Sequence, residues 1–273
     1  MSILHLLIVA MIQGLTEFLP VSSSGHLILL SNVTGLDDQG QVIDVAVHVG
    51  TLGAVILYFW SDVKVALRGS VALLKWDLHA PGAHLALCLG IATVPVVLFG
   101  LVIALSGFDD WMRSDEDMRA MKIIGWTMLG FGLLLYWSDQ RGATTRHATQ
   151  WTIRHALAMG LWQAIALIPG TSRSGITITA GRMMGYDRES AARLAMLMSI
   201  PTILASGVFS AGEVAARADL AAARDATIAA ILAFGAALAA LWIMMRLLRS
   251  VSFTPYVIYR VLLGLTLLGI AYF

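Results

Sequence analysis

Six long apolar stretches constrain the fold of this chain more than any other feature of its sequence. Each is close to the roughly 20 residues that an α-helix needs to cross the hydrocarbon core of a bilayer. A soluble core does not require such runs, and 58% of the residues are hydrophobic while only 13% are charged. The sequence therefore predicts an all-α integral membrane protein with six transmembrane helices. The stretches lie at residues 42–60, 84–105, 121–137, 194–211, 226–245 and 255–273.

Two further apolar regions, residues 3–30 and 153–184, are interrupted in the middle. The interruptions at 20–25 and 169–175 contain proline, which removes a backbone donor and ends or kinks a helix. Neither half of either region is long enough to cross a bilayer alone. Irregular backbone at membrane depth is tolerated only where protein or a watery cavity satisfies it. We therefore predict two re-entrant helical hairpins that face each other inside the bundle.

The two broken regions also resemble each other as sequence, which predicts an internal repeat of residues 1–138 and 151–273. Each copy would hold one hairpin, which returns to its starting side, and three spans, so the second copy is inverted relative to the first. Folds of this kind place their site near the midplane, where the broken helices meet. Chance similarity between apolar segments rich in small residues is the alternative. An offset of 150 aligns Gln13 with Gln163, Ser22 with Ser172, Ser24 with Ser174, and Gly25 with Gly175.

Lysine and arginine residues near the span ends predict the orientation, because cytoplasmic loops carry an excess of them. Eleven lie on the side reached after the first span and five on the other, so the first side is expected in the cytoplasm and both termini outside. The eleven are Lys64, Arg68, Lys75, Arg141, Arg146, Arg154, Arg182, Arg188, Arg193, Arg246 and Arg249. The five are Arg113, Arg119, Lys122, Arg217 and Arg224.

Composition also limits the class of partner. The net charge of +1 gives no indication of a nucleic-acid partner, and the single cysteine, Cys88, cannot form an internal disulfide. The N-terminal apolar run lacks a cationic segment and a small-residue cleavage site, so no signal peptide is expected. The oligomeric state is left open.

The first break holds the densest set of polar side chains, within QGLTEFLPVSSSGHL. Gln13 and Glu17 are four residues apart and share a helix face. The serines that follow Pro20 are good N-cap residues, and a helix start inside a membrane offers free N–H groups to an anion. A kinked helix with a snorkelling glutamate is the alternative, but ionisable residues at membrane depth usually have a function.

The second break reads IPGTSRSGITIT and places Arg173 among hydroxyl residues. A planar guanidinium beside hydroxyls and open backbone N–H groups is suited to phosphate, since arginine binds phosphate oxygens bidentately. A structural ion pair with Glu17, or an arginine that reaches the headgroups, is the alternative. Asp44 and His48 lie four apart at the start of the first span. They would support the site or contribute a metal ligand, or they form a satisfied polar pair at a helix end.

The motifs QGLTEFLPVSSSGH and PGTSRSGIT resemble the two signature regions of the bacterial undecaprenyl-diphosphatase family, the bacitracin-resistance type, and the resemblance covers essentially the whole chain. It implies a multi-pass enzyme of the bacterial inner membrane that removes the terminal phosphate of the C55 polyprenyl diphosphate lipid. The site would open to the outer face, and recycling of the lipid carrier would serve cell-wall synthesis. The family also implies a divalent metal, Mg²⁺ or Ca²⁺.

The resemblance assigns active-site roles by motif position. We predict Glu17, Ser23, His26 and Arg173 as catalytic, with Glu17 as the metal ligand. The first residue of the family's glutamate motif is either Glu or Gln, and here it is Gln13. A mechanism that needs two carboxylates from this helix is therefore not expected. The substrate-binding residues are predicted to be Gln13, Ser24, Ser172, Ser174 and Thr177.

The nucleophile is predicted from helical spacing. In a helix that begins at the serines, Ser23 lies three residues before His26 and shares its face, so we predict that Ser23 attacks with His26 as its base. Attack by His26 itself or by an activated water is the alternative. A transporter or flippase of a lipid phosphate is the alternative function, because inverted repeats with broken helices also build transporters.

Overall fold

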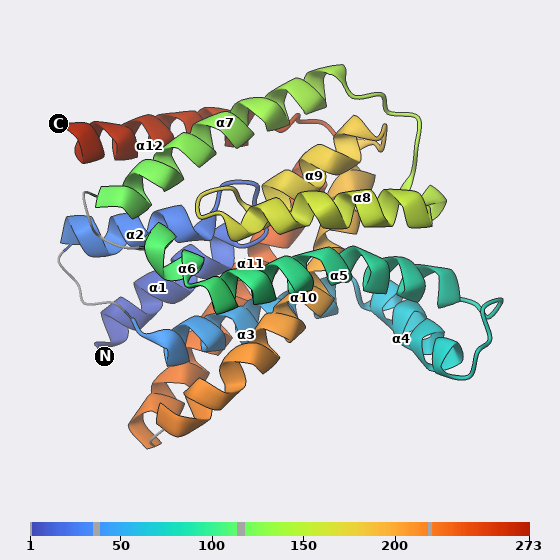
Figure 1. Cartoon of the computed structure of the whole chain (residues 1–273), viewed down its shortest axis with the longest axis horizontal. Helices are drawn as coiled ribbons and strands as arrows, with labels where there is room; N and C mark the ends of the chain where they lie inside the picture. Colours follow the sequence, from blue (N-terminus) through green and yellow to red (C-terminus); the bar gives the residue numbers. More distant parts are fainter. Residues whose placement is uncertain (1, 35–38, 114–117, 218–219) are drawn as a thin grey trace.

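Six helices in the computed structural model are long and apolar enough to cross a membrane, as the sequence predicted. The structure describes residues 2–34, 39–113, 118–217 and 220–273, and within these ranges it contains helices and no strand (Figure 1). The protein is therefore an all-α, multi-pass membrane protein. The six helices are α3 (Gln41–Tyr58), α5 (Ala83–Ser106), α7 (Arg119–Arg141), α10 (Arg188–Arg217), α11 (Leu220–Leu247) and α12 (Thr254–Tyr272).

Both interrupted regions contain two helical segments separated by irregular backbone. The first comprises α1 (Ile3–Thr16) and α2 (Ser23–Thr34). The second comprises α8 (Ile153–Ala164), a 3-10 turn η3 (Ile165–Leu167) and α9 (Arg173–Met183). In Figure 1 the far ends of α1 and α2 lie at the left and those of α8 and α9 at the right, with both breaks between them. This arrangement is the one expected of opposed hairpins, and their re-entrant placement in a membrane stays a prediction.

The helix contacts agree with the predicted inverted repeat. In that repeat α1 corresponds to α8, α5 to α11, and α7 to α12. Helix α1 packs on α11, and α8 packs on α5, so exchanging the two halves exchanges these pairs. Helices α7 and α12 pack on each other. The contacts support two related halves around a two-fold axis, which remains our proposal for the domain organisation.

One pair of equivalent contacts is unequal, and this inequality matters for the site. Helix α3 packs closely on α11, where a Cβ added to Gly50 would lie 2.1 Å from the carbonyl oxygen of Ala230. The equivalent helices of the other half, α10 and α5, are in much less extensive contact. A cavity of about 840 Å³ lies between them.

Three shorter helical elements of the described chain, outside the two broken regions, were not predicted. Helix α4 (Trp60–Leu74) follows α3 directly and carries Lys64 and Arg68 on its exposed surface. Its charged residues interrupt the apolar run, so the search for apolar stretches of bilayer length did not find it, although its apolar residues recur at helical spacing. Helix α6 (Phe108–Arg113) and the 3-10 turn η2 (Ala148–Gln150) are also additional.

A buried cluster of charges joins four helices at the end of the molecule away from both termini. Arg182 of α9 and Arg188 of α10 donate to Oδ1 of Asp139 in α7 at 3.1 and 2.8 Å. The N–H of Phe253, just before α12, donates to Oδ2 of the same carboxylate at 3.3 Å. The side chains of Asp139 and Arg182 are 0% and 1% exposed. One carboxylate therefore forms ion pairs with two guanidiniums and connects α7 with α9, α10 and the start of α12.

We expect Asp139→Asn to lower the free energy of unfolding by about 3–5 kcal/mol, the cost of removing one partner of a buried ion pair. Thermal unfolding in detergent measures the change. Glu189→Gln is the control, because Glu189 forms an exposed pair with Arg249 at 3.7 Å, and such pairs contribute about 0–1 kcal/mol. Equal effects of the two substitutions would contradict a stabilising role of the buried cluster.

Candidate active site

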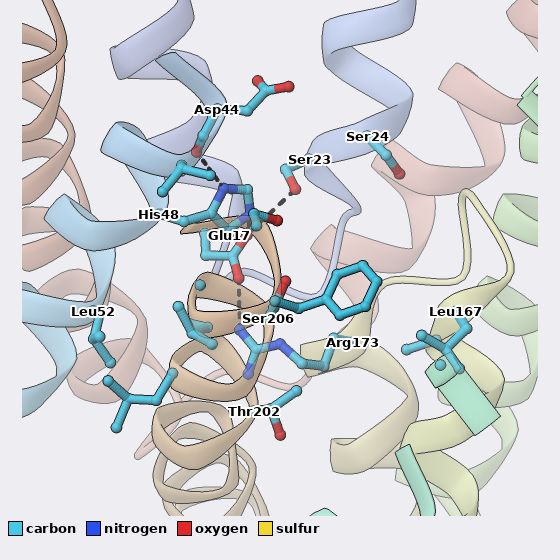
Figure 2. A pocket seen from close by; sticks show the side chains of 18 of the residues that line it. Glu17, Ser23, Ser24, Asp44, His48, Leu52, Leu167, Arg173, Thr202 and Ser206 are labelled. Atoms are coloured by element: carbon cyan, nitrogen blue, oxygen red, sulfur yellow. Dashed lines mark hydrogen bonds and ion pairs between the residues drawn. The ribbon is translucent and has the colours of Figure 1, made fainter. Parts of the chain in front are cut away.

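A cavity of about 840 Å³ opens between α3, α5 and α10, with both helix breaks at its base. Figure 2 shows Glu17, Ser23 and Arg173 at this base. His48 approaches them from α3 and Thr202 from α10. The walls are mainly apolar, so the cavity combines a charged base with a lining suited to hydrocarbon. The apolar lining includes Val45, Val49, Leu52, Ile103, Leu204, Val208 and Phe209.

Glu17 and Arg173 form an ion pair between the two breaks. Nη2 of Arg173 donates to Oε1 of Glu17 at 2.6 Å, and the side chains are 13% and 9% exposed. Each charge offsets part of the other's desolvation cost. Nη1 of Arg173 is buried and has no hydrogen-bond partner in the described ranges. The guanidinium therefore holds the carboxylate with one nitrogen, while the donor capacity of another is unused.

Three polar side chains surround the second carboxylate oxygen of Glu17, Oε2. Oε2 accepts from Nε2 of Gln13 at 2.7 Å and from Oγ of Ser23 at 3.4 Å, and Nε2 of His48 lies 3.8 Å away. Nδ1 of His48 is 2.7 Å from the carbonyl oxygen of Asp44 and must carry a proton, since a carbonyl only accepts. In the neutral imidazole, Nε2 thus presents its lone pair to Gln13, 3.1 Å away.

The groups around Glu17 fit the predicted divalent cation. Oε1 of Gln13 is buried without a hydrogen-bond partner in the part of the chain that is described. A half-turn of the amide would exchange its nitrogen for this oxygen and bring it beside Glu17 and the lone pair of His48. Mg²⁺ and Ca²⁺ prefer oxygen ligands, and Mg²⁺ in particular usually keeps several waters. No group of three His, Cys, Asp or Glu side chains that could hold a metal occurs in the described residues, so substrate oxygens and water would complete the coordination.

Asp44 supports His48 through its backbone and not through its carboxylate. Its carbonyl oxygen accepts from the imidazole, while Oδ1 accepts from Nε2 of Gln39 at 2.7 Å. Asp44 and His48 both line the cavity. The predicted supporting role is therefore compatible with the structure, and His48 is the member of the pair that faces Glu17.

Ser23 and His26 are not brought together, contrary to the prediction from spacing. Nδ1 of His26 lies 2.7 Å from the carbonyl oxygen of Ser22, one helical turn back, and Nε2 lies 2.5 Å from the hydroxyl of Tyr259 on α12. The two rings stack with centroids 5.4 Å apart. The carbonyl fixes the ring so that its lone pair accepts from Tyr259, and His26 does not line the cavity. In this arrangement Ser23 is hydrogen-bonded to Glu17 instead.

Within each break, the two serines that flank Ser23 or Arg173 contact each other through their hydroxyls. Ser22 and Ser172 have left-handed φ values of 78° and 68°, and their hydroxyls lie 3.0 and 3.1 Å from those of Ser24 and Ser174. Ser172 also caps α9 by accepting from the N–H of Gly175, whereas the hydroxyl of Ser22, predicted as a cap, contacts Ser24. The same geometry in both copies agrees with the predicted repeat.

Two predicted substrate-binding residues are buried behind the cavity wall. Oγ of Ser174 donates to the carbonyl oxygen of Leu19 at 2.9 Å, and Oγ1 of Thr177 donates to that of Arg173 at 2.7 Å. Both side chains are fully buried and neither lines the cavity. Ser174 thus satisfies a carbonyl of the first break, and Thr177 bonds back one turn within α9. Direct contact of either hydroxyl with a substrate is therefore not supported. Ser24 and Ser172 do line the cavity, and Gln13 lies behind Glu17.

Several polar residues near the cavity were not predicted. Thr202, Ser206 and Ser210 of α10 all line it at a spacing of four, a helical stripe that the sequence contained. Nε2 of Gln163 donates to Thr202 at 3.1 Å, much as Gln13 faces His48 in the other half. Tyr259 gave no sequence signal, because its contact with His26 joins positions 233 residues apart.

Comparison with known proteins identifies the family. The family described as Bacitracin resistance protein BacA matches residues 6–266. The chain is 66% identical to the undecaprenyl-diphosphatase of Dinoroseobacter shibae and 64% identical to that of Jannaschia sp., with 100% of both chains covered in each case. It is 42% identical to the undecaprenyl-diphosphatase of Chromohalobacter salexigens over 98% of both chains. A cavity with an arginine–glutamate pair at its base and mainly apolar walls agrees with these names, and the chain belongs to the undecaprenyl-diphosphatase family.

Proposed function

We propose that this membrane protein hydrolyses undecaprenyl diphosphate to undecaprenyl phosphate and inorganic phosphate at the Glu17–Arg173 pair. The observation that carries the proposal is a guanidinium with an unpartnered nitrogen, next to a carboxylate, at the base of an apolar cavity. The charged base would bind the diphosphate, and the apolar wall would contact the prenyl chain. Family membership favours this activity over transport of a lipid phosphate.

The terminal phosphate would bind between Arg173 and the start of α9. Arg173 is the first residue of α9, so the positive dipole end of this helix is at the same break as its side chain. Positioning and charge stabilisation account for most of the catalysis of phosphoryl transfer. Nη1 of Arg173 is free to bind an oxygen of the phosphate without breaking the ion pair.

Ser23 is the proposed nucleophile, and Glu17 replaces His26 as its proton acceptor. Oγ of Ser23 would form a bond to the terminal phosphorus while the bond from phosphorus to the bridging oxygen breaks, and undecaprenyl phosphate leaves. The hydroxyl proton would pass to Glu17, the acceptor it contacts at 3.4 Å. Water would then hydrolyse the phosphoserine and release inorganic phosphate. Direct attack by water remains the alternative that the experiment below distinguishes.

A divalent cation, Mg²⁺ or Ca²⁺, is proposed at Glu17 with Gln13 and His48. When bound, it would neutralise charge on the diphosphate oxygens. Glu17 contacts both Arg173 and the cation-binding groups through different oxygens, so one carboxylate is able to orient the two. Gln13 would contribute its amide oxygen where other members of the family have a carboxylate.

The inner membrane, periplasmic termini and an outward-facing site are proposed from the direction of the cavity. Gln41 and Asp44, at the start of α3, and Ser210, toward the end of α10, line one end of it. These helix ends lie on the side with fewer lysine and arginine residues, which is the outer side by charge distribution. Both termini lie at the corresponding left end of Figure 1.

Arg173→Lys should lower kcat/KM by about 10²-fold or more, the loss seen when a donor to the transition state is removed. The ammonium keeps the charge but cannot bind Glu17 and phosphate with separate nitrogens of a rigid fork. Phosphate release from undecaprenyl diphosphate by purified protein measures the effect. Turnover close to wild type would refute the phosphate-binding role.

Glu17→Gln should abolish activity, whereas Gln13→Glu should be tolerated and should lower the metal concentration needed for half-maximal activity. Added negative charge beside Glu17 strengthens cation binding, and its removal weakens it. Activity measured against Mg²⁺ and Ca²⁺ after chelation gives both values. Full metal-dependent turnover by Glu17→Gln would move the metal to Asp44 and His48.

Rapid quench with labelled substrate tests the nucleophile. Wild-type enzyme should form an acid-stable phosphoenzyme that is absent in Ser23→Ala, because a phosphoserine survives acid. His26→Gln is the matched variant from the same helix, and it should still form the phosphoenzyme. An acid-labile phosphoenzyme would indicate His26, and substantial turnover by Ser23→Ala without any phosphoenzyme would indicate water.

A cysteine that replaces Gln41 should react with an impermeant thiol reagent in intact cells, and one that replaces the exposed Arg68 should not. Both are made in a Cys88→Ala background, which removes the buried native thiol. The reverse labelling would place the mouth of the cavity in the cytoplasm.

A further inference from the structure

Arg260 is a fully buried arginine in α12 whose hydrogen bonds all go to backbone carbonyls. Nε donates to Met128 at 3.3 Å and Nη1 to Pro20 at 3.4 Å. Nη2 contacts the carbonyl oxygens of Thr127, Gly170 and Thr171 at 3.4, 3.2 and 3.0 Å. The guanidinium is thus surrounded by five carbonyl oxygens from three separate segments of the chain.

No carboxylate neutralises Arg260 within the described ranges, where the ion pairs of the other buried arginines involve Asp139 and Glu17. A buried charge is costly unless it is extensively hydrogen-bonded. The carbonyl dipoles therefore stabilise the cation. In return the cation satisfies the carbonyls of Pro20, Gly170 and Thr171, which lie in the breaks and not inside a helix. Because the five bonds come from one rigid side chain, they fix the positions of the segments that carry these carbonyls relative to one another.

The segments held by Arg260 are the two breaks that form the site. Pro20 belongs to the first break, between Glu17 and Ser23. Gly170 and Thr171 belong to the second break and come immediately before Ser172 and Arg173. Thr127 and Met128 belong to α7, whose Thr127 hydroxyl also donates to the carbonyl oxygen of Pro169 at 2.7 Å.

Two glycines leave the space that this side chain occupies. A Cβ added to Gly175 of α9 would lie 2.8 Å from Nη1 of Arg260, closer than van der Waals contact allows. One added to Gly132 of α7 would lie 3.4 Å from both Cβ and Nε. The guanidinium therefore fills a fitted site between α7, α9 and α12.

We propose that Arg260 is a positioning residue of the phosphatase, which holds both helix breaks so that the Glu17 and Arg173 side chains meet across them. It does not touch the cavity, so it acts through the backbone from which these side chains project. The proposal rests on the proposed hydrolysis of undecaprenyl diphosphate only for the choice of substrate.

Arg260→Lys tests whether the fork is needed as well as the charge. An ammonium has three donors on one atom and cannot reach five carbonyls that the guanidinium contacts with three nitrogens. We expect kcat per folded molecule to fall on the order of 10²-fold, the effect of a displacement near 1 Å at a reacting centre. KM for the lipid should be unchanged, because the apolar wall is formed by α3, α5 and α10, which Arg260 does not contact.

Arg182→Lys is the matched control. Arg182 is equally buried and also donates to backbone carbonyls, those of Ala143, Asp139, Gly142 and Tyr186, but at the end of α9 away from the breaks. Both variants should unfold at a lower temperature. Only Arg260→Lys should lose kcat when activity is normalised to the folded, monodisperse protein at a temperature below both transitions.

The outcomes separate this proposal from the proposed function. Wild-type kcat per folded molecule in Arg260→Lys, or an equal loss of kcat in Arg182→Lys, would overturn the positioning role and leave the phosphatase activity in place. Failure of the wild-type protein to release phosphate would overturn the proposed function itself. If Arg260→Lys does not fold, Gly132→Ala keeps the arginine and moves it slightly, and a fall in kcat without a change in KM is the expected result.

Discussion

The breaks in two helices leave backbone carbonyl and amide groups without helical partners inside a bundle that excludes water, and the structure depends on how these groups are satisfied. Arg260 donates hydrogen bonds to carbonyl groups of both breaks. Ser174 donates across to Leu19, and the N–H of Gly170 donates to Ser24 at 3.4 Å. Each break therefore supplies partners to the other, so neither has a stable conformation by itself.

The cavity follows from a departure from symmetry. If α10 packed on α5 as closely as α3 packs on α11, the space above the breaks would be filled by side chains. The gap leaves an apolar wall of α3, α5 and α10 residues over the polar base. If the two halves are related as proposed, the difference in packing between them accounts for the cavity, which we propose as the space for the prenyl chain.

The same division appears in the chemistry of the base. The first half provides Glu17 with its neighbours Gln13, Ser23 and His48, and the second half provides Arg173. The position aligned with Arg173 in the first half is Ser23, and the position aligned with Glu17 is Leu167. The acidic and the basic side of the proposed phosphate site therefore come together only where the two halves meet.

Much of this protein is determined by the sequence alone. Apolar runs of bilayer length predicted six helices, because in lipid a chain of that composition has no other way to satisfy its backbone. The prolines at positions 20 and 169 predicted the interruptions, and the motifs around Glu17 and Arg173 predicted the family. Contacts between distant segments were decided only by the tertiary structure. Local spacing suggested that Ser23 faces His26, but the imidazole is hydrogen-bonded to the hydroxyl of Tyr259, which is far away in the chain. Arg260 showed no partner in the sequence because its partners are backbone carbonyl groups, which every residue carries and which only the folded chain brings to one place.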